Sequence, residues 1–80
     1  MTRADFLDTV EVEGIRSSAF DLEGRGDECY VLLAERGQWE VYYAQRGLRS
    51  DAQRFPTEEK ALTHLMERMR ADPTTKLRAA

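Results

Sequence analysis

Residues 29–45, CYVLLAERGQWEVYYAQ, constrain the fold of this chain more than any other stretch. They include Trp39 and all three tyrosines, interleaved with valines and leucines. Aromatic and β-branched side chains fit the pleated, half-buried surface of a sheet. The pair Arg36-Gly37 interrupts these apolar and aromatic residues, and glycine is a residue type that favours turns. The stretch therefore predicts two β-strands that pair as a hairpin.

From residue 38 onward the side chains alternate with the period of a strand. Three of them are expected on one face: Trp39, Val41 and Tyr43. The residues between them, Glu40, Tyr42 and Ala44, are expected on the other. Both faces of the hairpin thus carry apolar side chains. One face needs a helix to cover it, and the other is available as an interface.

The register of the first strand depends on the turn. A two-residue turn at Arg36-Gly37 brings Leu32 and its even-numbered neighbours to the face of Trp39, but it needs a positive φ at Arg36, which a long side chain resists. A three-residue loop, 35–37, needs a positive φ only at Gly37. It shifts the register by one, so that Val31 and its odd-numbered neighbours face Trp39 instead. Composition alone leaves both registers open.

A helix is predicted on each side of the hairpin. Residues 2–13 have a capping box, Thr2 with Asp5, and Gly14 as a stop. Their apolar residues, at helical spacing, are Phe6, Leu7 and Val10. Residues 57–71 begin with Thr57 as the cap and end before Pro73. This second helix has one apolar stripe, formed by Ala61, Leu62, Leu65, Met66 and Met69.

The connecting segments carry weaker signals. Residues 19–22 predict a short edge strand with Phe20 and Leu22 inward, and residues 24–26 a flexible turn. Residues 46–51 predict a second turn, and residues 53–55 a third strand that Pro56 ends. The tail, 74–80, is polar and predicted to be frayed. We therefore expect residues 1–80 to form a single α+β domain: a small antiparallel sheet of about three strands with an N-terminal and a C-terminal helix packed on it.

Composition narrows the possible classes of function. No apolar run approaches the roughly 20 residues of a membrane helix, and the N-terminus is too acidic for a signal peptide. The single cysteine, Cys29, fits a reducing compartment, so we expect a cytoplasmic protein that contacts no membrane. Residues 1–40 hold 10 acidic and 4 basic side chains, and residues 41–80 hold 5 and 8. If the acidic and basic halves of the sequence form separate surfaces, this uneven charge steers charged partners. The same charges are also consistent with ordinary solvent-exposed faces that bind nothing.

The sequence does not favour catalysis. Nucleophilic catalysis needs a Ser or Cys beside a base, and nothing links Cys29 to the single histidine, His64. One His and one Cys cannot supply the three or four ligands of a usual metal site. Adjacent carboxylates such as Glu58 and Glu59 point apart. We therefore expect no enzyme activity, no metal site and no cofactor.

The order helix, strands, helix resembles a double-stranded-RNA-binding domain in topology. That resemblance implies a cluster of lysines at the start of the second helix, directed at the RNA backbone. Here Glu58-Glu59-Lys60 occupies that place. Arg46, Arg49 and Arg54 alone make a weak basic footprint, so nucleic-acid binding is a distant third hypothesis.

A second resemblance extends from about residue 19 to residue 75. Its motifs are aromatic-x-Leu at 30–32, Gly-x-Trp-x-Val-Tyr-Tyr at 37–43, Arg-Gly at 46–47, Phe-x-Thr-Glu-Glu-x-Ala at 55–61 and Asp-Pro-Thr at 72–74. In these the chain is similar to small bacterial immunity-like proteins that are encoded beside polymorphic secreted toxins. The resemblance implies the register with Tyr30 and Leu32 inward beside Trp39. It also implies a non-catalytic protein that neutralises a partner toxin by binding it.

If Trp39 faces the core, Tyr42, Arg46 and Arg49 lie near one another on the other side of the hairpin. Tyrosine and arginine are the side chains most often found at binding hot spots, so these three are the candidate partner-binding residues. The alternative is that Tyr42 packs against the first helix and the arginines are merely solvated. A different class of function also stays open: a structural or regulatory module that forms a homodimer through an exposed sheet edge.

Overall fold

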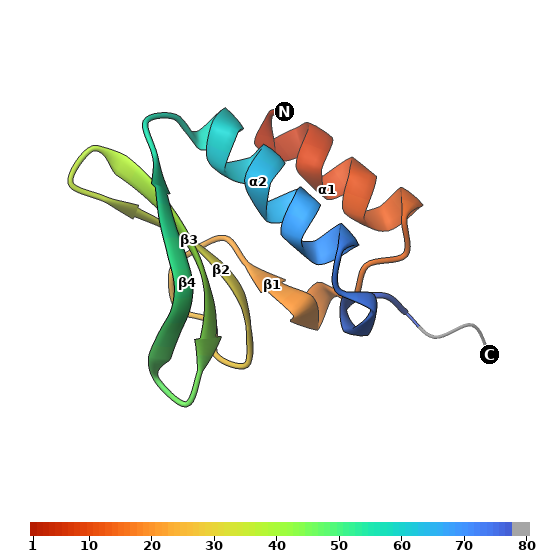
Figure 1. The fold of residues 1–80 in the computed structure, drawn as a ribbon. Helices are drawn as coiled ribbons and strands as arrows, with labels where there is room; N and C mark the ends of the chain where they lie inside the picture. The colour runs from red at the N-terminus through yellow and green to blue at the C-terminus, as the bar shows by residue number, and fades with distance from the viewer. Residues whose placement is uncertain (78–80) are drawn as a thin grey trace.

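The computed structural model describes residues 1–77 and shows the expected α+β fold, with four strands rather than three (Figure 1). The strands form one sheet in the order β1-β2-β3-β4, with β1 parallel to β2 and the other pairs antiparallel. The main elements are α1 (Arg3–Val12), β1 (Phe20–Asp21), β2 (Cys29–Glu35), β3 (Gln38–Gln45), β4 (Leu48–Phe55) and α2 (Glu58–Arg70). Two short 3-10 turns, Ser17–Ala19 and Pro73–Thr75, complete the chain.

The β2–β3 hairpin adopts the two-residue turn. Arg36 has a φ of 51° and Gly37 a φ of 76°, and Leu32 lies opposite Val41. This confirms the register with Tyr30 and Leu32 on the face of Trp39. Arg36 adopts a positive φ despite its long side chain, because a turn with two positive φ angles matches the twist of the flanking strands.

The β3–β4 hairpin repeats that turn at Arg46, with a φ of 52°, and Gly47, with a φ of 78°. The predicted turn over 46–51 and strand over 53–55 were therefore wrong in extent, because β4 begins at Leu48. The polar residues of β4 disguised its first half. A β-bulge opposite Tyr42, with Asp51 at a φ of 53°, lets the strand continue past that point.

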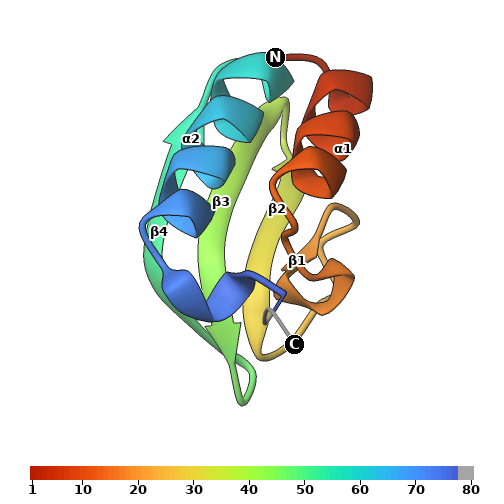
Figure 2. The same cartoon turned by 90° about the vertical axis from the view of Figure 1, so that its right-hand side faces the viewer.

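Both helices pack on the same face of the sheet, here called the inner face (Figure 2). All five residues of the predicted stripe of α2 are buried, and Leu32 and Val41 meet them from the sheet. The capping box of Thr2 and Asp5 is present in α1. Phe6 and Val10 are buried as predicted, but Leu7 is 45% exposed. That part of the prediction was wrong because α1 lies at the margin of the core and buries only a narrow stripe.

The segments around the helices are more ordered than expected. Phe20 and Leu22 pack against the inner core, as predicted for a short edge strand. Thr75 is buried and donates its hydroxyl hydrogen bond to the carbonyl of Met69 at 2.8 Å. Lys76 forms a β-bridge with Ile15. The prediction of a frayed tail was therefore wrong for residues 74–77, and residues 78–80 lie outside the described residues. Within residues 1–77, no helix has the length and apolar character needed to cross a membrane.

Candidate functional site

The face of the sheet opposite the helices, here called the outer face, has a small core of its own. It consists of Cys29, Val31, Tyr42 and Ala44, all at most 5% exposed. Within residues 1–77, no helix lies over it (Figures 1 and 2). The alternation of β2 and β3 places these residues on the face away from Leu32 and Val41.

A glycine-containing segment between β1 and β2 covers part of the outer face. A Cβ atom added to Gly24 would lie 2.4 Å from Leu33 Cδ1, and one added to Gly26 would lie 2.5 Å from Cys29 Sγ. Asp21 Oδ2 fixes the segment by accepting backbone hydrogen bonds from Arg25 at 2.7 Å and Gly26 at 3.0 Å. Residues 24–26, predicted as a flexible turn, are thus a packed cover that requires glycine for its close approach.

A buried carboxylate organises the β4 side of the outer face. Glu40 is 7% exposed, and it accepts hydrogen bonds from two arginines of β4. Arg49 Nη1 lies 2.7 Å from Glu40 Oε1, and Arg54 Nε lies 3.2 Å from Glu40 Oε2. A buried charge is costly unless it is paired and hydrogen-bonded, and both oxygens of Glu40 meet that condition. The carboxylate therefore holds both arginines in fixed positions.

Tyr42 lies beneath Arg49, whose guanidinium carbon is 4.7 Å from the centre of the tyrosine ring. Only 4% of Tyr42 is exposed. Burial raises the pKa of its hydroxyl, while the neighbouring Arg49 cation opposes that rise. The alternative that Tyr42 packs against the first helix is wrong, because α1 is on the inner face. Tyr42 is a platform for Arg49 rather than a projecting anchor.

A groove of about 350 Å³ lies beside this pair. Arg49 and Tyr42 form part of its lining, together with the glycine-containing cover and the β3–β4 turn. Arg46 is in that turn, next to Gly47, which lines the groove, and is exposed. The structure thus brings two of the three candidate residues, Tyr42 and Arg49, into contact and places Arg46 at the adjoining turn.

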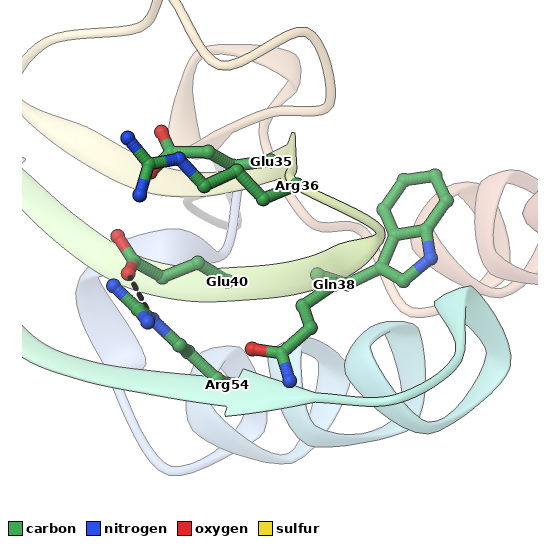
Figure 3. Close-up of a pocket in the computed structure, with 6 residues that line it drawn as sticks. Glu35, Arg36, Gln38, Glu40 and Arg54 are labelled. Atoms are coloured by element: carbon green, nitrogen blue, oxygen red, sulfur yellow. Dashed lines mark hydrogen bonds and ion pairs between the residues drawn. The ribbon is translucent and has the colours of Figure 1, made fainter.

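A second, smaller cavity of about 50 Å³ lies on the other side of Glu40, toward the β2–β3 turn. Figure 3 shows Arg54 paired with Glu40 there, with Glu35 and Arg36 drawn above them and Gln38 beside the strand. Glu40 and Arg54 line this smaller cavity, and Arg49, the other arginine paired with Glu40, lines the larger groove.

Four further residues belong to this surface without having been predicted there from the sequence: Glu40, Arg54, Gly24 and Arg25. Glu40 was placed on the correct face, but its pairing depends on the register of β4, which the polar sequence of that strand conceals. Gly24 and Gly26 carried a usable signal, since paired glycines often mark a close backbone approach. Nothing in their spacing says which strand they approach.

The groups considered for catalysis do not come together. Cys29 belongs to the outer-face core, where burial raises the pKa of its thiol. His64 is on α2, with its ring 4.9 Å from that of Phe55, and burial lowers its pKa. A thiol with a raised pKa is a poor nucleophile. Among residues 1–77, no three His, Cys, Asp or Glu side chains gather closely enough to hold a metal ion.

Comparison with known proteins leaves the family open. No protein-family model, no curated protein and no solved structure matches the chain.

Proposed function

We propose that this chain is a non-catalytic protein-binding domain of the immunity type, which neutralises a bacterial toxin in the cytoplasm by binding it directly. The observation that supports this most is the Arg49–Tyr42–Glu40 cluster on the outer face. It places an arginine, held by an ion pair and an aromatic ring, beside an open groove.

Binding hot spots favour side chains that lose little freedom when the partner arrives. Arg49 meets this condition, because Glu40 and Tyr42 already fix its guanidinium, although its side chain is 47% exposed. Arg25 and Arg46 lie near the groove and form no ion pair among residues 1–77. Exposed charges of this kind accelerate the encounter with an oppositely charged partner. The outer face thus combines one fixed anchor, Arg49, with two exposed cations close to the groove.

The test is co-expression in bacteria with the product of a toxin-like reading frame adjacent to this gene. We expect the wild-type chain to restore growth and to copurify with the toxin. Arg46→Glu combined with Arg25→Glu should weaken binding by about tenfold, because two cations that attract the partner become anions that repel it. Both residues are exposed, so the fold should be unaffected.

The matched control is Lys60→Glu combined with Lys76→Glu, two exposed residues outside the outer face. It changes the net charge by the same amount and should leave neutralisation intact. Equal loss of binding in both double variants would mean that net charge causes the effect. If the wild-type chain itself does not copurify with the toxin, the proposal is rejected.

The homodimer alternative has one observation in its favour. β4 is an edge strand of eight residues, and seven of them are exposed. However, β4 also carries the bulge at Asp51 and charged side chains at Arg49 and Arg54, which are features that discourage edge pairing. Sedimentation equilibrium separates the two proposals: a stable dimer of the isolated chain supports the homodimer, and a monomer supports the toxin-binding role.

A further inference from the structure

We propose that the groove beside Arg49 receives a carboxylate, the side chain of an Asp or Glu on a loop of the partner protein. This deepens the proposed function by naming the chemistry of the contact, and the identity of the partner rests on that function. The carboxylate would lie against the edge of the guanidinium that Glu40 leaves free.

The hydrogen-bonding capacity of Arg49 supports this occupant. A guanidinium has five N–H donors in a planar fork. Nη1 donates to Glu40, and within residues 1–77 neither Nε nor Nη2 has an acceptor. An arginine fork with free donors matches a carboxylate in two parallel hydrogen bonds. Because Glu40 and Tyr42 hold the guanidinium in place, the position at which a carboxylate could meet its free donors is also set.

The acidic residues around the groove have internal roles. Asp27 Oδ1 accepts a hydrogen bond from the backbone of Gly47 at 3.3 Å, and Asp21 Oδ2 holds the glycine-containing cover. Both oxygens of Glu40 are occupied. The cations Arg25 and Arg46 are free of ion pairs among the described residues. Asp27 is the one carboxylate in the described lining, and it forms no ion pair among residues 1–77. The unpaired Arg25 and the free N–H donors of Arg49 outnumber it, so the groove favours an anion.

The size and composition of the groove favour one acidic side chain over a nucleic-acid strand. About 350 Å³ is at the lower end of ligand-binding cavities, and its walls include Gly24, Gly26 and Ala44. A strand with a charge at every nucleotide would bring several phosphates to a groove whose described lining contains two arginines, Arg25 and Arg49. Nucleic-acid grooves instead follow the backbone with an extended run of cations.

The test is a side-chain and backbone NMR titration with two small probes, N-acetyl-glutamate N-methylamide and its uncharged glutamine counterpart. The glutamate probe should cause saturable shifts at Arg49 Nε–Hε and at the amides of residues 24–27. The glutamine probe should bind at least tenfold more weakly. Similar shifts with both probes would overturn the proposal.

Three variants separate the guanidinium from general charge. Arg49→Gln should weaken glutamate binding at least tenfold, and Arg49→Lys should weaken it too, because an ammonium lacks the planar fork. Arg36→Gln, beside the smaller cavity, is the matched control and should bind like the wild type. Unchanged binding in Arg49→Gln contradicts the proposal. If that variant fails to fold, Arg49→Lys with binding equal to the wild type contradicts it instead.

A hexamer of single-stranded uridylate addresses the competing macromolecule. We expect no shifts at the groove at concentrations where the glutamate probe is saturating, and stronger binding of the hexamer there would overturn the proposal. None of these titrations involves a toxin. Toxin neutralisation without glutamate binding would reject the carboxylate site and keep the proposed function. Glutamate binding without toxin capture would keep the carboxylate site and reject the proposed function.

Discussion

The two faces of the sheet are buried in different ways. The inner face is covered by two helices and contributes to a core of eleven buried residues, all apolar. The outer face has a cluster of four buried apolar residues, covered by a glycine-containing segment and by arginines fixed on a buried carboxylate. Apolar burial on the inner face supplies most of the stability, because that term grows with the area removed from water. The outer face depends on contacts that tolerate no extra atoms and on charges that need partners.

The largest effect is expected from a charge placed in the inner core. Leu65 is fully buried, so Leu65→Asp introduces a carboxylate with no counter-charge. We expect a loss of about 3–5 kcal/mol, which is enough to unfold a domain of this size. Thermal unfolding followed by circular dichroism measures it. Leu48→Asp, at a position that is 71% exposed, is the control and should change stability by less than about 0.5 kcal/mol. A cooperative melt near that of the wild type for Leu65→Asp would show that the inner face is not the main core.

The next effect tests the cover of the outer face. Gly24→Ala places a Cβ atom 2.4 Å from Leu33 Cδ1, whereas Gly37→Ala meets nothing within 4 Å. Both glycines have similar positive φ values, 73° and 76°, so the two substitutions share the same backbone strain. We expect Gly24→Ala to cost about 2 kcal/mol more than Gly37→Ala in urea unfolding, through overpacking alone. Equal costs would mean that the cover gives way easily and is not packed against the sheet.

These two faces also explain how far the sequence could predict the structure. The helix caps at Thr2 and Thr57 are local signals, and the apolar stripe of α2 is a periodic one. From these signals the two helices and the packing of α2 on the inner face could be predicted. The position of the cover over Leu33 and the pairing of Glu40 with two arginines of β4 depend on contacts between distant segments. No period of 2 or 3.6 residues encodes such contacts. The candidate site was therefore only partly predictable, through Tyr42 and Arg49.

The division of charge along the sequence shows the same limit. The acidic first half and the basic second half suggested a dipolar molecule. Within the helical layer the fold pairs side chains of the two halves in both senses: Arg70 Nε lies 2.9 Å from Glu13 Oε1, and Arg3 Nη2 lies 2.9 Å from Glu58 Oε2. Sequence halves do not correspond to faces here, because α1 and α2 pack side by side (Figure 2). The local charge of the groove matters more for a partner than the charge of either half.

A smaller effect is expected from neutralising the carboxylate of the outer face. Glu40→Gln keeps the shape but presents an amide to two arginines that were paired with a charge. Because both arginines are about half exposed or more, we expect a loss of only about 1.5 kcal/mol. Urea unfolding measures this loss, and the NMR signal of Arg49 Nε–Hε should broaden as the guanidinium is released. A variant as stable as the wild type with an unchanged Arg49 signal would remove Glu40 as the organiser of this face.

The smallest effect is a pH dependence of stability, expected from His64, which lies against Phe55 at the edge of the inner layer. Its Nε2 atom is buried without a hydrogen-bond partner among the described residues, and burial, followed by the nearby Arg68 cation, lowers its pKa from the ordinary 6.5. The carboxylate of Glu67 opposes this and raises the pKa of His64. The folded state therefore holds fewer protons on His64 than the unfolded state, so stability falls as the pH drops below about 6.5 and levels off below the folded pKa.

The slope cannot exceed about 1.4 kcal/mol per pH unit for one proton. The carboxylates with lowered pKa values, such as Asp5 and Asp72, contribute a similar loss only at more acidic pH, below about 4. The pKa of Glu13 is lowered too, by its hydrogen bond from Arg70, so its loss of stability begins at a somewhat higher pH than that of the aspartates. Urea unfolding toward the neutral end of the range from pH 5 to pH 7 should therefore report mainly His64, and His64→Gln should flatten the curve there. A wild-type curve that is already flat in this range would mean that the imidazole becomes protonated as readily in the folded chain as in the unfolded one. The outer face, whose cluster contains no histidine, should keep its Arg49 signal unchanged across the same range.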